Sequence, residues 1–148
     1  MHRVLYPMVA LILVGLLAAG CKRETVAPTH HPAKLEDTDQ KGIKRVILEA
    51  RAAERIGLET AQVREEMVTV AGQTALRKVV PYGALMYDTK GAAWTYTSPQ
   101  ALTFVRVPIV VQDIEGDRVI LAEGPPTGTV VVTVGAPELM GAEHKYGH

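Results

Sequence analysis

Cysteine is almost absent from this chain of 148 residues, since Cys21 is the only one. A single thiol excludes an internal disulfide framework, so the fold depends on its hydrophobic core. Excess charge is also lacking, because 16 Lys and Arg residues balance 16 Asp and Glu residues. This balance gives no electrostatic basis for nucleic-acid binding. The chain is long enough for one small domain and a targeting segment.

Recognisable catalytic motifs are lacking as well. The sequence shows no ordered Ser, His and Asp set, no Gly-rich phosphate-binding loop and no Cys–His cluster. Four acidic residues lie at expected turns, where carboxylates accept hydrogen bonds from backbone amides: Asp88, Asp113, Glu115 and Asp117. We therefore expect a protein without enzymatic activity and without a resident cofactor.

The first 20 residues are organised like a secretory signal. His2 and Arg3 precede an apolar run, Val4–Gly20, that is shorter than the stretch of about 20 residues that a membrane-spanning helix needs. Small residues lead directly to Cys21, an arrangement that resembles the lipobox of bacterial lipoproteins. The resemblance implies cleavage after residue 20, lipid attachment at Cys21 and a place on the periplasmic side of the inner or outer membrane. The alternatives are an ordinary signal peptide and a buried thiol in a membrane helix.

Residues 21–42 are mostly polar, charged or Pro and lack apolar periodicity. Such a composition does not bury enough apolar surface to fold. We interpret this stretch as a flexible tether that joins the anchor to a folded domain at residues 43–148.

A short helix is expected near the start of that domain, over residues 49–56. Ala52, Ala53 and Ile56 are spaced three and four apart and share one helical face. Gly57 follows as the C-terminal cap.

Strand patterns fill most of the remaining chain. Apolar residues alternate over residues 79–143, and the odd positions of residues 104–112 are all apolar, so we expect these side chains to face the core. Residues 58–64 and 67–71 predict two more strands, joined tightly through Glu65-Glu66. About six or seven strands and one helix predict a mainly β, closed barrel-like domain. In this domain, we expect the strands within residues 45–71 to supply the missing edge of the sheet formed by residues 79–143.

Five segments carry a resemblance to a known family. They are Arg45–Arg64, Val79–Leu85, Phe104–Pro108, Gly116–Val119 and Val131–Leu139. In this order they resemble the opening and closing parts of the membrane-proximal region of periplasmic adaptor proteins, the membrane fusion subunits of resistance-nodulation-division efflux pumps. In that family the two parts form one domain, and a lipoyl-like domain, a helical hairpin and a β-barrel domain lie between them. Here only a short turn region separates the two parts.

The resemblance implies a lipid-anchored accessory or truncated adaptor, which binds and positions components of an efflux transporter. Its partners would be an inner-membrane efflux pump, a full-length adaptor subunit or further copies of itself. A degenerate remnant of a full-length adaptor is a second interpretation.

Four residues are candidates for partner contact. Trp94 and Tyr96 lie on a short aromatic strand, and such residues combine a large contact area with a polar tip. Their alternative place is the core. Arg106 and Arg118 are candidates for pairing with acidic groups of a partner, or for ordinary solvated charges.

Histidine residues suggest a different function, a periplasmic module that binds or delivers copper, silver or zinc. His144 and His148 are spaced as two ligands on one helical face, and His30 is next to His31 in the tether. Adjacent histidines without a fixed third ligand are more commonly solvated.

Overall fold

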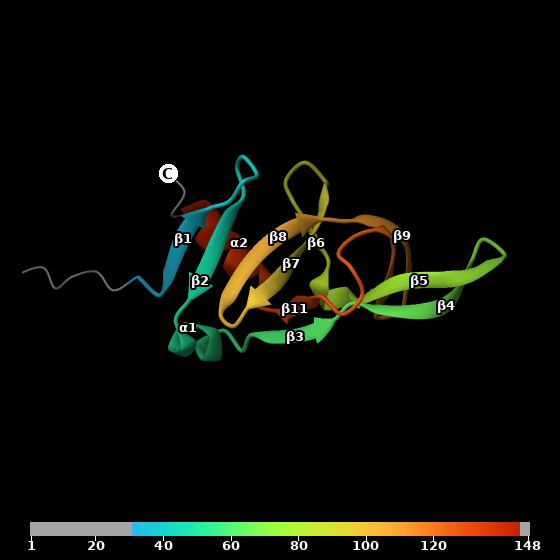
Figure 1. Ribbon diagram of the computed structural model, residues 1–148, viewed down its shortest axis with the longest axis horizontal. Helices are drawn as coiled ribbons and strands as arrows, with labels where there is room; N and C mark the ends of the chain where they lie inside the picture. The colour runs from blue at the N-terminus through green and yellow to red at the C-terminus, as the bar shows by residue number, and fades with distance from the viewer. Residues whose placement is uncertain (1–30, 146–148) are drawn as a thin grey trace, which may run out of the picture. The chain divides into compact units, whose positions relative to one another are not determined.

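The computed structural model of the chain describes residues 31–145 (Figure 1). The predicted signal segment, Cys21, His30 and His148 lie outside the described residues. The strands are β1 (Ala33–Asp37), β2 (Lys44–Leu48), β3 (Glu59–Gln62), β4 (Arg64–Val70), β5 (Gln73–Pro81), β6 (Met86–Tyr87), β7 (Ala93–Gln100), β8 (Thr103–Pro108), β9 (Val110–Glu115), β10 (Arg118–Glu123) and β11 (Val130–Val134). The helices are α1 (Ala50–Arg55), the single 3₁₀ turn η1 (Tyr82–Ala84) and α2 (Ala136–Lys145).

The domain is mainly β, as predicted, and its strands form two antiparallel sheets. The larger sheet has seven strands, in the order β1-β2-β8-β7-β11-β3 with β6 beside β7, and the smaller has the order β4-β5-β10-β9. No pairing within residues 31–145 joins the outer strands of either sheet into a ring, so the expected closed barrel is not found there.

The two halves of the chain interleave, which confirms the expectation that residues 45–71 complete the later sheet. Strand β2 pairs with β8, and β3 pairs with β11. In the smaller sheet, β4 and β5 form a hairpin, and β5 pairs with β10.

The chain passes between the two sheets at four places, after β3, β5, β8 and β10. Buried residues at and near these passages form one apolar cluster: Val63, Val80, Ala84, Ile109, Val119, Leu121 and Val131. The residues at these connections therefore form the core that holds the two sheets together. Burial of each large apolar side chain in it stabilises the fold by roughly 1.5–3 kcal/mol.

A second core lies where the helices pack on the larger sheet. It consists of Ala33, Val46, Leu48, Ala53, Tyr96, Phe104, Val132, Ala136 and Leu139. Helix α1 agrees with the predicted helix, and Gly57 follows it with a positive φ of 62°.

At three places the secondary structure differs from the expectation. Strand β1 lies inside the stretch interpreted as a tether, because Ala33 and Leu35 alternate with charged residues and pair with β2. Strand β4 runs straight through Glu65-Glu66, the predicted turn, and belongs to a different sheet from β3. Helix α2 was not expected at all.

The buried face of β8 is also the opposite of the predicted one. Phe104 and Arg106 are buried, whereas Val105 and Val107 are only half-buried. The strand ends at Pro108, and Ile109 leads the chain into the smaller sheet, so residues 104–112 are two strands and not one.

Candidate functional site

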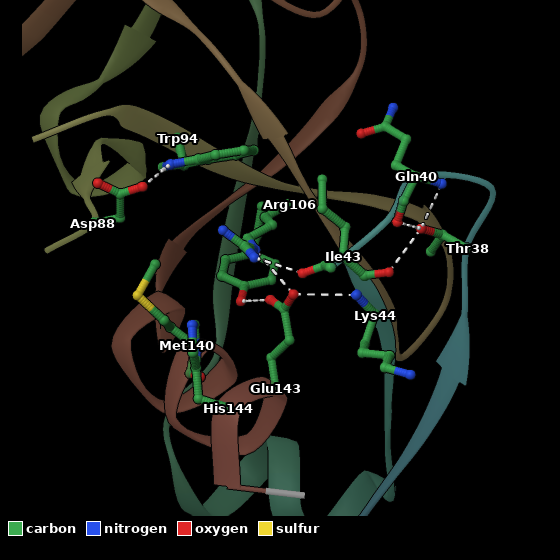
Figure 2. Close-up of polar contacts among 12 residues, drawn as sticks. Thr38, Gln40, Ile43, Lys44, Asp88, Trp94, Arg106, Met140, Glu143 and His144 are labelled. Carbon is green, nitrogen blue, oxygen red and sulfur yellow. Dashed lines mark hydrogen bonds and ion pairs between the residues drawn. The ribbon is translucent and has the colours of Figure 1, made fainter. Parts of the chain in front are cut away.

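A buried ion pair connects α2 to the larger sheet. Glu143, on the inner face of α2, is 4% exposed, and Arg106 of β8 is 9% exposed. The Arg106 Nε donates to Glu143 Oε1 over 2.9 Å (Figure 2). Burying two charges is costly unless their remaining hydrogen-bonding groups are also satisfied, so the surroundings of this pair determine its stability.

Those surroundings supply the missing partners. The Tyr96 hydroxyl donates to Glu143 Oε2 over 2.6 Å, and the Lys44 backbone N–H donates to Oε1 over 3.1 Å. The Arg106 Nη2 donates to the Gly42 carbonyl oxygen over 2.9 Å. Together these contacts fasten α2, two central strands and the β1–β2 turn at one point.

Tyr96 is fully buried within this cluster. Burial, together with the hydrogen bond to the Glu143 carboxylate, raises the pKa of the Tyr96 hydroxyl above its usual value of 10.0. The neutral hydroxyl is therefore the form that the folded protein favours.

This raised pKa predicts a loss of stability at alkaline pH. The stabilisation that the buried, neutral Tyr96 hydroxyl contributes to the fold is fully present below pH 10, the pKa of an unfolded tyrosine. It is lost as pH rises toward the higher pKa of the folded state. We expect the free energy of unfolding to fall by up to about 1.4 kcal/mol per pH unit above pH 10. Tyr96→Phe should remove this slope and cost about 2 kcal/mol at neutral pH. Urea denaturation between pH 7 and 11 measures both, and an unchanged slope in the variant would contradict the assignment.

Trp94 extends the cluster toward the surface. The Arg106 guanidinium carbon lies 4.6 Å from the centre of the Trp94 ring, a cation–π contact. The Trp94 indole Nε1 donates to Asp88 Oδ2 over 3.1 Å. Asp88 Oδ1 also accepts from the backbone N–H groups of Lys90 and Ala92, which confirms its predicted turn role. The Ala92 hydrogen bond is the main cause of a lowered pKa at Asp88.

The structure therefore places two of the four residues proposed for partner contact in the core. Tyr96 and Arg106 are core residues whose polar atoms are bonded inside the domain. Trp94 is half-buried. Arg118 lies nearer the surface, where it donates to Glu66 over 2.7 Å and to Glu115 over 2.8 Å. Each of the four side chains makes at least one hydrogen bond to another residue of the domain.

The candidate metal ligands are only partly described. His31 is exposed, and His144 is exposed with its Nδ1 2.8 Å from the Met140 carbonyl oxygen. Within residues 31–145 there is no group of three or more His, Cys, Asp or Glu residues that could hold a metal ion. The same residues include no helix with the length and apolar character needed to cross a membrane.

Two exposed tyrosines and one exposed valine lie on η1, β6 and β11, and we call these three residues the tyrosine surface. Tyr82 of η1 and Tyr87 of β6 are each 54% exposed, and Val134 at the end of β11 is 43% exposed. The Gly83 backbone packs closely on the Thr133 carbonyl group. Tyr82 and Val134 are the sequence neighbours of these two residues, so they lie on segments that contact each other. The sequence contains these tyrosines beside the proposed aromatic strand, but its alternation pattern does not separate the exposed aromatics from the buried ones.

Comparison of the chain with models of protein families, with curated proteins and with solved structures finds no match.

Proposed function

We propose that this protein is a lipid-anchored, periplasmic accessory domain of an efflux transporter, which acts by protein–protein contact. The observation that supports this function best is the interleaving of the two resembling parts. Strands β2 and β3, from the opening part, pair with β8 and β11, from the closing part, so both parts belong to one domain. This is the arrangement that the resemblance to periplasmic adaptors implies.

The chain between the two parts is also informative. Where the family that this chain resembles carries three further domains, this chain has only residues 65–78, which lie within the β4–β5 hairpin. The hairpin spans residues 64–81, which is too short to bridge two membranes. We therefore propose a role in binding and positioning a pump or an adaptor subunit at one membrane, without enzymatic activity.

The tyrosine surface is the contact region that we assign to this partner. Tyrosines are enriched at the centres of protein interfaces because they bury a large area while losing little side-chain entropy. Attachment through Cys21 would hold the domain close to membrane proteins and raise its effective concentration, so a small contact surface is sufficient.

Photo-crosslinking in the native membrane tests this proposal. We expect a photoreactive amino acid at Tyr82 or Tyr87 to form an adduct with an inner-membrane transporter or adaptor subunit. The same group at Arg51, an exposed position of α1, is the control and should form none. The double variant Tyr82→Ala/Tyr87→Ala should lose co-purification of that partner, while its stability changes by roughly 0.5 kcal/mol or less per exposed site. Absence of any transport protein among the adducts of both tyrosine positions would refute the proposed function.

A further inference from the structure

The outer strands of the two sheets differ in how far they are protected from pairing with another chain. Exposed edge strands are commonly blocked by shortness, charges or bulges. Strand β3 has four residues, β1 has five and carries exposed charges, and the register of β9 with β10 shifts twice. Strand β4 has seven residues in unbroken register with β5. Its first half carries the charged residues Arg64, Glu65 and Glu66, but its second half, residues 67–70, carries no charge and is the unprotected part of this edge.

An exposed apolar pair lies on this same strand. Met67 of β4 is directly opposite Leu76 of β5, and they are 66% and 55% exposed, the two largest values among the exposed large apolar residues of the described chain. The next residue, Val68, points to the other face and is buried with Val79 and Ile120. The fold is thus complete without cover over Met67 and Leu76.

We propose that two copies of this chain pair antiparallel along β4, related by a two-fold axis that passes beside Met67. Such an interface is self-complementary, so one strand supplies both sides of it. Residues directly opposite each other in an antiparallel pair share one face of the sheet. Pairing of β4 with β4 therefore joins the two four-stranded sheets into one continuous sheet (Figure 1 shows the β4–β5 hairpin at the edge of the domain).

Charge and apolar contact select the register. With Met67 opposite Met67, Glu66 lies opposite Val68 and Glu65 lies opposite Thr69, so no like charges are directly opposed. The two Met67 and two Leu76 side chains then form one apolar row across four strands. Moving the axis one step toward the N-terminus places Glu66 opposite Glu66, and moving it the other way separates the methionines.

This inference does not depend on the proposed transporter contact, but the concentration of the chains on a membrane rests on the proposed lipid anchor at Cys21. Met67 and Leu76 lie on the β4–β5 hairpin, whereas the tyrosine surface lies on η1, β6 and β11. Either surface can fail its test without affecting the other. A contact of one strand pair buries a small area, so the dimer is expected to be weak in dilute solution and favoured where chains are concentrated on a membrane.

Disulfide trapping of the full-length protein in membranes tests the dimer. Met67→Cys should give a covalent dimer on mild oxidation, because the opposed Cα atoms would lie within the roughly 4.4–6.8 Å that a disulfide spans. Thr69→Cys should give none, because each Thr69 faces Glu65 of the other copy. The double variant Glu65→Cys/Thr69→Cys should restore the dimer. The unsubstituted chain shows any background from Cys21.

Three results would overturn the inference. They are no dimer from Met67→Cys, equal dimer from Met67→Cys and Thr69→Cys, and a disulfide between residue 67 and a different protein. The first excludes the register, the second indicates random collision, and the third assigns the β4 edge to another partner. Since Met67 and Thr69 are exposed, loss of folding is not expected to obscure these results, and circular dichroism of each variant checks this.

Discussion

Replacing Glu143 with Ala is expected to lower the free energy of unfolding by about 3–5 kcal/mol, the largest effect of any single substitution that we propose. The change removes three hydrogen bonds at once, from Arg106, Tyr96 and the Lys44 backbone. It also leaves the Arg106 guanidinium buried without its counter-ion, and an unpaired buried charge costs more than the lost contact itself.

A second glutamate on the same helix provides the control. Glu138 lies in the first turn of α2 and is exposed, so Glu138→Ala should cost only about 0.3–1 kcal/mol through its interaction with the helix dipole. Urea denaturation followed by the fluorescence of Trp94, the only tryptophan, measures both variants. Equal stability of the two variants would show that the buried pair does not hold α2 in place.

The pair can also be tested by removing both charges. The double variant Arg106→Met/Glu143→Leu should be less destabilised than the sum of the two single variants, because neither charge is then left buried alone. Additive effects in this cycle would indicate that Arg106 and Glu143 act separately.

The pattern of α2 explains why this helix was missed from the sequence. Ala136, Leu139, Met140 and Glu143 recur at the spacing of one helical face, but the last of them is charged. A charged residue on an apolar face weakens the helical pattern unless its partner is known. That partner, Arg106, lies 37 residues away in the sequence, and only the folded chain brings the two together.

The same partner explains the wrong face of β8. The alternation in residues 104–112 predicts that the odd positions face the core, because an arginine such as Arg106 normally points to solvent. Local signals were reliable where they depended on neighbouring residues, as in helix α1, Gly57 and the Asp88 turn. They failed at the Glu65-Glu66 turn and at β1, where pairing with another strand decides the conformation, and at β8 and α2, where burial depends on a distant charge. The polar cluster was therefore not predictable from one sequence.

Glycine 83 offers the second large effect, since it is the point where η1 packs on β11. A Cβ atom at this position would lie 2.4 Å from the Thr133 carbonyl oxygen, a distance that real side chains do not adopt. Gly83→Ala must therefore displace the backbone of η1 or β11, and we expect a cost of about 3 kcal/mol, near the upper end for overpacking. Because Tyr82 precedes Gly83, the substitution should also weaken the proposed transporter contact.

Gly141→Ala is the matched control, because an added Cβ there meets no atom within 4 Å and the residue lies inside α2. Alanine favours a helix over glycine by roughly 1 kcal/mol, so this variant should be slightly more stable than the parent protein. We thus expect the same substitution to have opposite signs at two positions, with a gap of roughly 4 kcal/mol in thermal or urea denaturation. If both variants shifted stability equally, the close packing of η1 on β11 would not exist in solution. The tyrosine surface, which depends on that packing, would then lose its structural basis.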